Sequence, residues 1–370
     1  MSDENNKSIQ RELDFSLISK ITERCNLSCS YCYLKDKKDL EMSINTAENL
    51  IREFLAFNKS FAHFTWVGGE PLLMPDSFFE EIKNFEEKYN INNLNVSHSI
   101  QTNGLKLTPN RFDNLKRMGF KIGISYDGTP DLQSERMNNN QIDISLDNIY
   151  YAKGKAGLLA VLSKKTIGKE EEIYDFFRRN TTFAKLNFFS PTGHGAEKKE
   201  ELMLSKKEAS DMLIKFYDLW KNDTSSLELR PPLEIVRSFF TGFPVSCDYS
   251  AISCYKILGS DSQGDIYPCS KAMNYSELRM GNINDGLVNL VGSEIHKMPL
   301  LRYKKLKKEN DPWFHLSSGG CIIEAKSDMG DYMKPTIYSE DVRYNLFEKI
   351  YEDMKDEKIR NLLEEKVGLI

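Results

Sequence analysis

The chain of 370 residues carries 50 basic and 55 acidic side chains, and its net charge of −5 gives it no general attraction for nucleic acid. No apolar run approaches the ~20 residues that span a bilayer, and the polar start MSDENNKSIQRE has no signal-peptide core. We therefore expect a cytoplasmic protein without a membrane or nucleic-acid partner. In that compartment its seven cysteines should bind metal rather than form disulfides.

Short apolar runs alternate with amphipathic helical segments after residues 1–12, whose composition is that of a disordered segment. The pattern predicts strands near 14–21, 62–67, 95–101, 121–126, 158–163 and 185–190, and helices near 44–58, 76–89, 110–118, 144–153 and 170–180. Alternating strands and helices form parallel sheets, so we expect an α/β fold. Six strand–helix units are too few for a closed eight-stranded barrel. In α/β barrels the loops at the carboxyl ends of the strands carry the active site.

The loop after the first predicted strand has the sequence TERCNLSCSYCY, residues 22–33, in which Cys25, Cys29 and Cys32 have the spacing Cys-x3-Cys-x2-Cys. Three thiolates on a short loop can bind three irons of a [4Fe–4S] cluster and leave the fourth iron open to a substrate-like molecule. The alternative is a zinc site, which normally needs a fourth protein ligand nearby.

The loops after the next three strands carry glycine-rich or polar segments: GGEP at 68–71, QTNG at 101–104 and SYDG at 125–128. Two glycines let a backbone approach a ligand closely, and the carboxylate of Glu70 can accept hydrogen bonds from an ammonium group. Each segment alone could be an ordinary turn. Arg136, in the polar stretch SERMNNN, could pair with a carboxylate through its planar guanidinium or simply be exposed.

Taken together, these segments resemble the radical S-adenosylmethionine superfamily over roughly residues 13–330. The resemblance implies an open, partial (β/α)6 TIM-like barrel. In that family the open iron binds the amino and carboxylate groups of S-adenosylmethionine, whose cleavage gives a 5′-deoxyadenosyl radical that removes a substrate hydrogen. The family's cluster ligands correspond here to Cys25, Cys29 and Cys32. Its S-adenosylmethionine contacts correspond to Tyr31, Gly68, Gly69, Glu70, Asn103, Ser125, Asp127 and Arg136.

The other cysteines lie beyond an amphipathic helix that we predict over 205–222. They are Cys247, Cys254, Cys269 and Cys321. Between the second and third of them, two short β-like runs joined at a Ser-Asp-Ser-Gln-Gly turn predict a hairpin that would bring these two thiols together. The four cysteines could hold a second cluster or be buried thiols without metal.

Their intervals resemble the SPASM family of auxiliary-cluster domains. Gly264 lies five residues before Cys269, as in that family's Gly-x4-Cys hairpin, and residues 279–283 (RMGNI) resemble the segment that follows it. Because residues 270–320 contain no cysteine, the resemblance implies a single auxiliary [4Fe–4S] cluster, closer to the shortened twitch version, and two clusters in all. Sulfatase-maturing members place a catalytic aspartate directly after the hairpin's second cysteine. This chain has Ser270 there, which disfavours sulfatase maturation.

We expect four regions along the chain. They are a disordered N-terminus at 1–12, the partial barrel at 13–225, a small C-terminal SPASM/twitch-like domain at 226–335, and a C-terminal helix within 336–370 that packs on the barrel, with dimerisation as the alternative role of that helix.

The resemblance implies an oxidoreductase that installs a crosslink, such as a carbon–carbon cyclophane or a thioether, in a ribosomally made precursor peptide, with an electron donor such as flavodoxin or ferredoxin. The alternatives are sulfatase-maturase-like protein modification, a small-molecule radical enzyme, or an iron–sulfur electron-transfer or zinc-binding structural protein. Because little sequence precedes the first strand, we expect no separate peptide-recognition domain. An open edge of the hairpin at 256–268 could then bind the peptide as an added strand.

Overall fold

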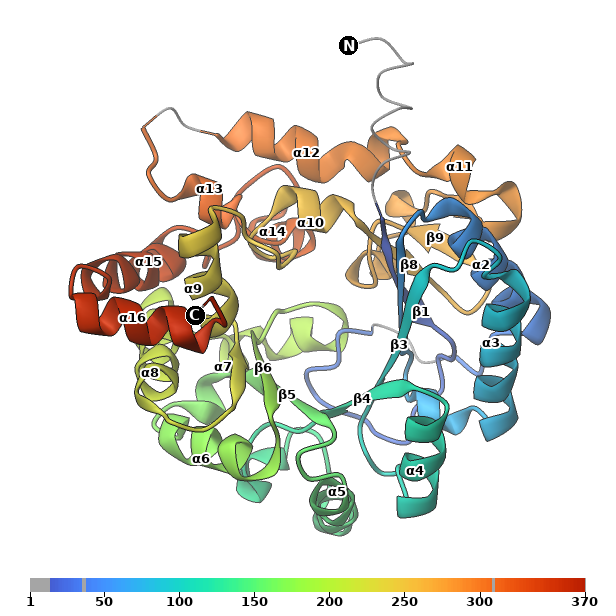
Figure 1. Ribbon diagram of the computed structural model, residues 1–370, viewed down its shortest axis with the longest axis horizontal. Coiled ribbons are helices and arrows are strands. Elements are labelled where there is room, and N and C mark those ends of the chain that lie inside the picture. Colours follow the sequence, from blue (N-terminus) through green and yellow to red (C-terminus); the bar gives the residue numbers. More distant parts are fainter. Residues whose placement is uncertain (1–13, 35–37, 308–309, 370) are drawn as a thin grey trace. The chain divides into compact units, whose positions relative to one another are not determined.

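The computed structural model describes residues 14–34, 38–307 and 310–369 (Figure 1), so the expected disordered segment 1–12 lies outside the described residues. Two compact units share the chain, and each is discontinuous in sequence. Unit 1 comprises Met1–Ser28, Leu34–Gly123 and Tyr255–Pro299, and unit 2 comprises Cys29–Tyr33, Ile124–Cys254 and Leu300–Ile370. These units divide the chain differently from the four expected regions, whose boundaries remain a prediction.

Unit 1 contains the first strand–helix repeats. Its elements, in chain order, are β1 (Ser16–Lys20), α2 (Ile44–Phe57), β2 (Phe61–Val67), α3 (Asp76–Tyr89), β3 (Asn95–Thr102), α4 (Pro109–Arg117) and the start of β4 (Phe120–Ser125). Strand β2 pairs in parallel with β1 on one side and with β3 on the other. The predicted alternation and the parallel α/β fold are confirmed for these elements.

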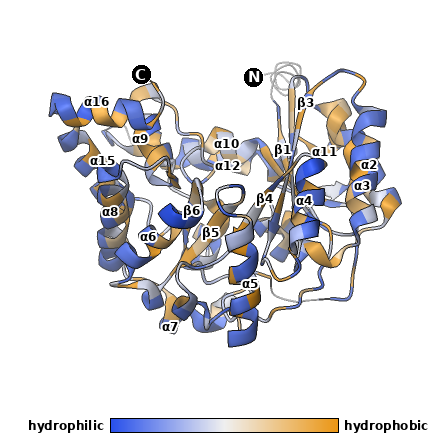
Figure 2. Cartoon of the chain, turned by 60° about the horizontal axis from the view of Figure 1, so that its bottom comes forward, coloured by the Kyte–Doolittle hydropathy of each residue, from blue (hydrophilic) through white to orange (hydrophobic). Residues whose placement is uncertain are grey.

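Amphipathic helices bury their apolar faces in the core of this unit. Helix α2 begins after Ser43, whose side chain accepts a hydrogen bond from the backbone N–H of Thr46, and it buries Phe54 among other apolar residues. The Phe54 ring meets that of Phe64 on β2 edge to face, with centroids 4.9 Å apart. Figure 2 shows both hydrophilic and hydrophobic residues along α2 and α3, the pattern that their 3.6-residue periodicity predicts.

The predicted hairpin is present as β8 (Ile257–Ser260) and β9 (Asp265–Tyr267), followed by β10 (Gly281–Asn282). Neither hairpin strand has an open edge, because β8 also pairs in parallel with β1 and β9 also pairs with β10. The expectation that a peptide adds to this hairpin is therefore wrong. The backbone groups that a peptide would use already bond to strands of the same unit.

Unit 2 contains the later strand–helix repeats. Its main elements up to residue 254 are α5 (Asn139–Tyr151), β5 (Gly157–Leu162), α6 (Glu170–Asn180), β6 (Phe183–Phe188), α7 (Lys199–Leu202), α8 (Lys206–Asn222), β7 (Glu228–Arg230) and α9 (Pro232–Thr241). Strand β6 pairs in parallel with β5 and with the short β7, which the sequence pattern did not predict. Helix α10 (Ala251–Tyr255) follows across the division between the units.

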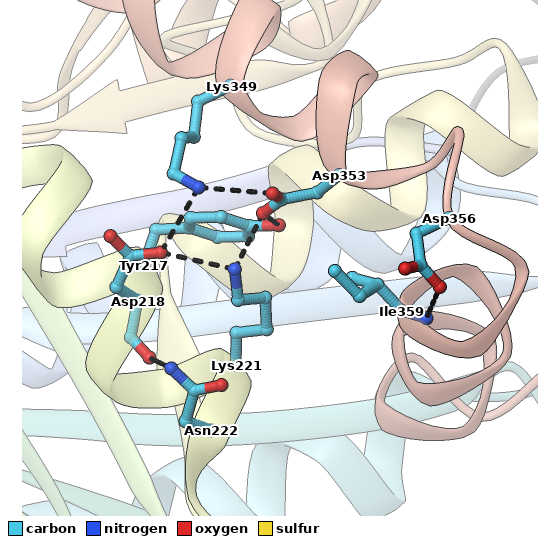
Figure 3. A network of polar contacts seen from close by, with 8 residues as sticks. All are labelled: Tyr217, Asp218, Lys221, Asn222, Lys349, Asp353, Asp356 and Ile359. Atoms are coloured by element: carbon cyan, nitrogen blue, oxygen red, sulfur yellow. Dashed lines mark hydrogen bonds and ion pairs between the residues drawn. The ribbon is translucent and has the colours of Figure 1, made fainter.

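The C-terminal part of the chain is helical. Its elements are α11 (Leu287–Leu290), α12 (Glu294–Leu306), α13 (Phe314–Ser317), α14 (Ile322–Met329), α15 (Asp341–Asp353) and α16 (Glu357–Lys366). The expected single terminal helix is instead two helices, because Asp356 caps α16 by accepting hydrogen bonds from the N–H groups of Lys358 and Ile359. Within unit 2, Asp353 of α15 binds Lys221 of α8 (Figure 3).

Among the described residues, no helix combines the length and the apolar character needed to cross a membrane.

Candidate functional site

In unit 1, the GGEP segment lies against the backbone that leads to Cys25. The Gly69 N–H donates to the Thr22 carbonyl and the Glu70 N–H to the Arg24 carbonyl, each at 2.8 Å. A Cβ on Gly69 would lie 2.2 Å from the Arg24 oxygen, and one on Gly68 would lie 2.6 Å from the Thr22 oxygen. The two glycines therefore permit a close backbone approach to the cysteine loop of the same chain.

The Glu70 carboxylate joins the loops after β2 and β3. It is buried and accepts hydrogen bonds from the Leu72 N–H at 2.9 Å, the Thr102 hydroxyl at 2.6 Å and the Asn103 N–H at 2.8 Å. Burial raises the pKa of Glu70, and these hydrogen bonds act in the opposite direction. A carboxylate has about four acceptor positions, so the three bonds within the chain leave limited capacity for an ammonium group.

Asn103 extends this network to the cysteine loop. Its side-chain amide donates to the Asn26 side chain at 2.8 Å, while its own oxygen accepts from the Leu105 N–H at 3.0 Å. The Leu27 N–H points to the Cys25 sulfur at 3.4 Å. The loops after β1, β2 and β3, which carry Cys25, the GGEP segment and the QTNG segment, thus meet in unit 1. The role of Asn26 was not predicted, although it is the residue next to that cysteine.

In unit 2, the segment Cys29–Tyr33 is held by the loop that follows β4. The Ser30 N–H donates to the Glu135 carbonyl at 2.9 Å, and the Ser30 hydroxyl bonds to the Glu135 carboxylate. The Gly195 N–H donates to the Cys32 carbonyl at 3.2 Å. These contacts fix the backbone beside Cys29 and Cys32. No sequence pattern pointed to Glu135, except its place beside Arg136.

Asp127 connects several predicted site residues in unit 2. Its carboxylate accepts from the Tyr31 hydroxyl, from the Val161 N–H at 2.9 Å and from the Arg136 guanidinium at 3.2 Å. The side chains of Arg136 and Asp127 are only 9% and 4% exposed, so this ion pair is shielded from water. The guanidinium also lies over the Tyr31 ring, 5.3 Å from its centroid. The alternative that Arg136 is simply exposed is therefore wrong. Its guanidinium is buried and pairs with the carboxylate of Asp127.

The protonation states follow from this environment. Burial raises the pKa of Tyr31 well above its ordinary value, so the phenol stays neutral and donates to Asp127. Burial opposes the charge of Arg136, but Asp127, Tyr31 and Cys29, with Asp127 contributing most, together raise the pKa of the guanidinium well above its ordinary value. Ser125, the last residue of β4, lies two residues before Asp127 in the chain and is half-buried.

Three of the four cysteines of the second set lie in unit 2. Cys321 is the N-cap of α14, and ligand atoms of Cys321, Asp248 and Glu324 lie within 4.8 Å of one another. Cys254, in α10, donates its backbone N–H to the Ser250 carbonyl, and Cys247 directly precedes Asp248. The fourth, Cys269, belongs to unit 1. Its backbone carbonyl group packs against β8, where a Cβ on Gly259 would lie 2.5 Å from the carbonyl of Cys269.

The donor atoms suit iron–sulfur clusters. None of the seven cysteines, all of which are described, forms a disulfide. Thiolates are the usual protein ligands of [4Fe–4S] clusters, and sulfur-rich donor sets favour such clusters or zinc. His63 and His98, by contrast, hydrogen-bond to Ser97 and Trp66 within unit 1. His194 is exposed in the segment after β6.

The chain resembles known proteins over most of its length. The model of the Radical SAM superfamily matches residues 19–176. The cysteine-type anaerobic sulfatase-maturating enzyme of Clostridium novyi (strain NT) is 26% identical over 367 residues, which cover 90% of this chain and 94% of that protein.

Two solved structures share the fold. The structure of native anSMEcpe with bound AdoMet and Cp18Cys peptide superposes with a TM-score of 0.82 at 22% identity, covering 95% of this chain and 99% of that one. Streptococcus suis SuiB bound to precursor peptide SuiA gives a TM-score of 0.62 at 14% identity, covering 90% and 76%. Residues 19–176 are a Radical SAM superfamily domain, and the chain that carries it is a homologue of the anaerobic sulfatase-maturating enzymes.

Proposed function

We propose that this radical S-adenosylmethionine protein uses two [4Fe–4S] clusters to modify a ribosomally made precursor peptide by installing a crosslink. The observation that carries the proposal is the Cys-x3-Cys-x2-Cys loop within a Radical SAM domain, joined in unit 1 to the GGEP segment by backbone hydrogen bonds. When bound, the cluster and S-adenosylmethionine supply the 5′-deoxyadenosyl radical that removes a substrate hydrogen. Flavodoxin or ferredoxin would supply the electron.

The protein's own residues hold and orient these groups. Cys25, Cys29 and Cys32 would bind the radical-generating cluster. Glu70 keeps the loops after β2 and β3 in place through its three internal hydrogen bonds, and its remaining acceptor position would serve the amino group of S-adenosylmethionine. The other proposed S-adenosylmethionine contacts are Tyr31, Gly68, Gly69, Asn103, Ser125, Asp127 and Arg136.

The second set, Cys247, Cys254, Cys269 and Cys321, would bind one auxiliary cluster. A peptide substrate is supported by the solved structures of this fold that contain peptides. A crosslink, rather than sulfatase maturation, is supported by Ser270, which offers a hydroxyl where the maturases are expected to have a carboxylate.

Sulfatase-maturase-like modification is the second candidate function. The observation in its favour is the similarity to a cysteine-type anaerobic sulfatase-maturating enzyme over 90% of this chain. The two candidates differ in how many substrate residues change. A crosslink removes two hydrogens and joins two residues, whereas modification of one residue leaves all others unlinked.

The first experiment tests the radical chemistry. Changing Cys25, Cys29 and Cys32 to alanine should remove roughly four irons per chain and abolish formation of 5′-deoxyadenosine after anaerobic reconstitution. The variant should stay coloured and reducible, because the auxiliary cluster remains. A triple variant that still cleaves S-adenosylmethionine would overturn the radical site, and a colourless one would overturn the auxiliary cluster. Zinc in place of iron and sulfide in the wild-type protein would instead show that it is a zinc-binding structural protein.

The second experiment separates the two candidate functions. The reconstituted enzyme is incubated with a cysteine-containing sulfatase peptide and, separately, with small peptides encoded beside its gene. We expect a neighbouring peptide to lose two hydrogens, with no tandem mass-spectrometric fragments from cleavage between the two joined residues. A mass change confined to one residue of the sulfatase peptide, with every backbone fragment present, would instead establish the second candidate.

A further inference from the structure

Arg302, on α12 in unit 2, buries its guanidinium almost completely, and the residue is 2% exposed. Five hydrogen bonds use its N–H groups: to the Lys334 carbonyl at 3.0 and 2.7 Å, to Gly320 at 2.6 Å, to Gly319 at 2.6 Å and to Ser318 at 3.4 Å. Every acceptor is a neutral backbone carbonyl. Within the described ranges, no carboxylate forms an ion pair with Arg302.

Three of these carbonyls belong to the turn directly before Cys321. Ser318, Gly319 and Gly320 all have left-handed backbone conformations, with φ values of 49°, 76° and 81°. A side chain on Gly320 would strain this conformation and place its Cβ 2.4 Å from the Thr336 hydroxyl. The turn therefore directs successive carbonyls at one guanidinium and leads straight into a proposed cluster ligand.

A buried cation bound only by neutral groups needs a negative charge nearby, because desolvation penalises the charged form. Burial lowers the pKa of Arg302 to about 10; the charges of Cys321 and Cys254 act in the opposite direction, and the positive charge of Arg343 adds to the lowering. Both cysteines belong to unit 2 and to the proposed auxiliary set. A cluster bound by four thiolates carries net negative charge, and nearby charge is one of the factors that set its reduction potential.

We propose that Arg302 is a positioning residue that holds the turn before Cys321 and provides the counter-charge of the auxiliary cluster. The proposal rests on that cluster being present. A fixed positive charge favours the reduced, more negative state of the cluster, so Arg302 raises the cluster's reduction potential. Loss of the charge should lower the potential, while a variant that keeps the charge should preserve it.

The test uses the triple alanine variant of Cys25, Cys29 and Cys32, in which the auxiliary cluster is the only chromophore. Arg302→Met removes the charge, Arg302→Lys keeps it, and Lys305→Met removes an exposed charge from the same helix as a control. Each protein is reconstituted anaerobically, assayed for iron, and titrated with reductant while the reduced cluster is followed by electron paramagnetic resonance.

We expect Arg302→Met to lower the ratio of reduced to oxidised cluster at least tenfold at a fixed solution potential, a shift of about 59 mV for a one-electron couple. Arg302→Lys and Lys305→Met should stay within threefold of the parent. If Arg302→Met holds no iron, retention of iron and potential by Arg302→Lys still supports the role of the charge. The role of the charge would be overturned if the reduction potential shifted equally in Arg302→Met and Arg302→Lys or shifted in neither. Loss of iron from both variants would overturn it as well. A colourless parent variant would instead overturn the auxiliary cluster itself.

Discussion

At the scale of single residues, the missing side chain of Gly69 sets how closely the GGEP segment approaches the cysteine loop. Gly69→Ala would place a Cβ 2.2 Å from the Arg24 oxygen, a backbone atom that can move only if the loop before Cys25 moves. We therefore expect Gly69→Ala to lose most of its S-adenosylmethionine cleavage and to retain about half of the wild-type iron, that of the auxiliary cluster. Iron analysis and assay of 5′-deoxyadenosine measure both effects.

Gly154→Ala is the control for this substitution. Gly154 has a left-handed conformation, with φ of 70°, and no atom lies within 4 Å of the position that a Cβ would take. Alanine should cost this site about 1 kcal/mol of stability through backbone strain alone. Its iron content and cleavage activity should match the wild type. Full activity in Gly69→Ala would mean that the close backbone contact does not hold the cysteine loop.

At the scale of elements, helices α8 and α15 are joined by a cluster of charged and phenolic side chains (Figure 3). The Asp353 carboxylate, on a side chain only 11% exposed, binds the Lys221 ammonium at 2.7 Å and accepts from the Tyr217 hydroxyl at 2.8 Å. Asp353→Ala would leave the buried Lys221 with Asp218 as its remaining acid, at 3.2 Å. Because one counter-charge remains, we expect Asp353→Ala to lower the free energy of unfolding by about 2 to 3 kcal/mol, at or below the usual cost of breaking a buried ion pair.

Glu352→Ala is the matched control on α15. Its carboxylate is 64% exposed and pairs with Lys355, so its removal should change stability by less than about 0.5 kcal/mol. The measurement is the free energy of opening of the α8 and α15 amides by native-state hydrogen exchange. Equal losses in the two variants would show that the buried cluster contributes no more than an exposed pair.

At the scale of the whole molecule, local periodicity predicted the six strand–helix repeats because the apolar residues of each helix and strand recur with the spacing of its buried face. It could not predict that β8 pairs in parallel with β1, since Ile257 and Ser16 lie far apart in sequence and their pairing depends on tertiary structure. The site motifs were located by spacing, but the partners of Glu70 and the burial of Arg302 depend on loops that only the folded chain brings together.

The pH dependence of stability is a property of the whole molecule that one buried histidine should change measurably. His296, 1% exposed and against the rings of Phe15 and Tyr255 in unit 1, has its pKa lowered by burial to about 4. An unfolded histidine titrates near 6.5, so between these values the unfolded chain binds more protons than the folded one. The stability present above pH 6.5 should therefore fall as the pH falls towards 4.

For His296 alone, this loss should reach roughly 2 kcal/mol at pH 5 relative to pH 8. His296→Phe keeps an aromatic ring but cannot titrate, so its stability should fall less over that range, even if loss of the hydrogen bond from the Gly292 N–H lowers stability at every pH. Substitution of the exposed His194 by phenylalanine, which changes no residue of unit 1, serves as the control for replacing a histidine elsewhere in the chain. Native-state hydrogen exchange of unit 1 at pH 5 and pH 8, corrected for intrinsic rates, measures the slopes. Parallel slopes for wild type and His296→Phe would show that folding does not lower the pKa of this histidine.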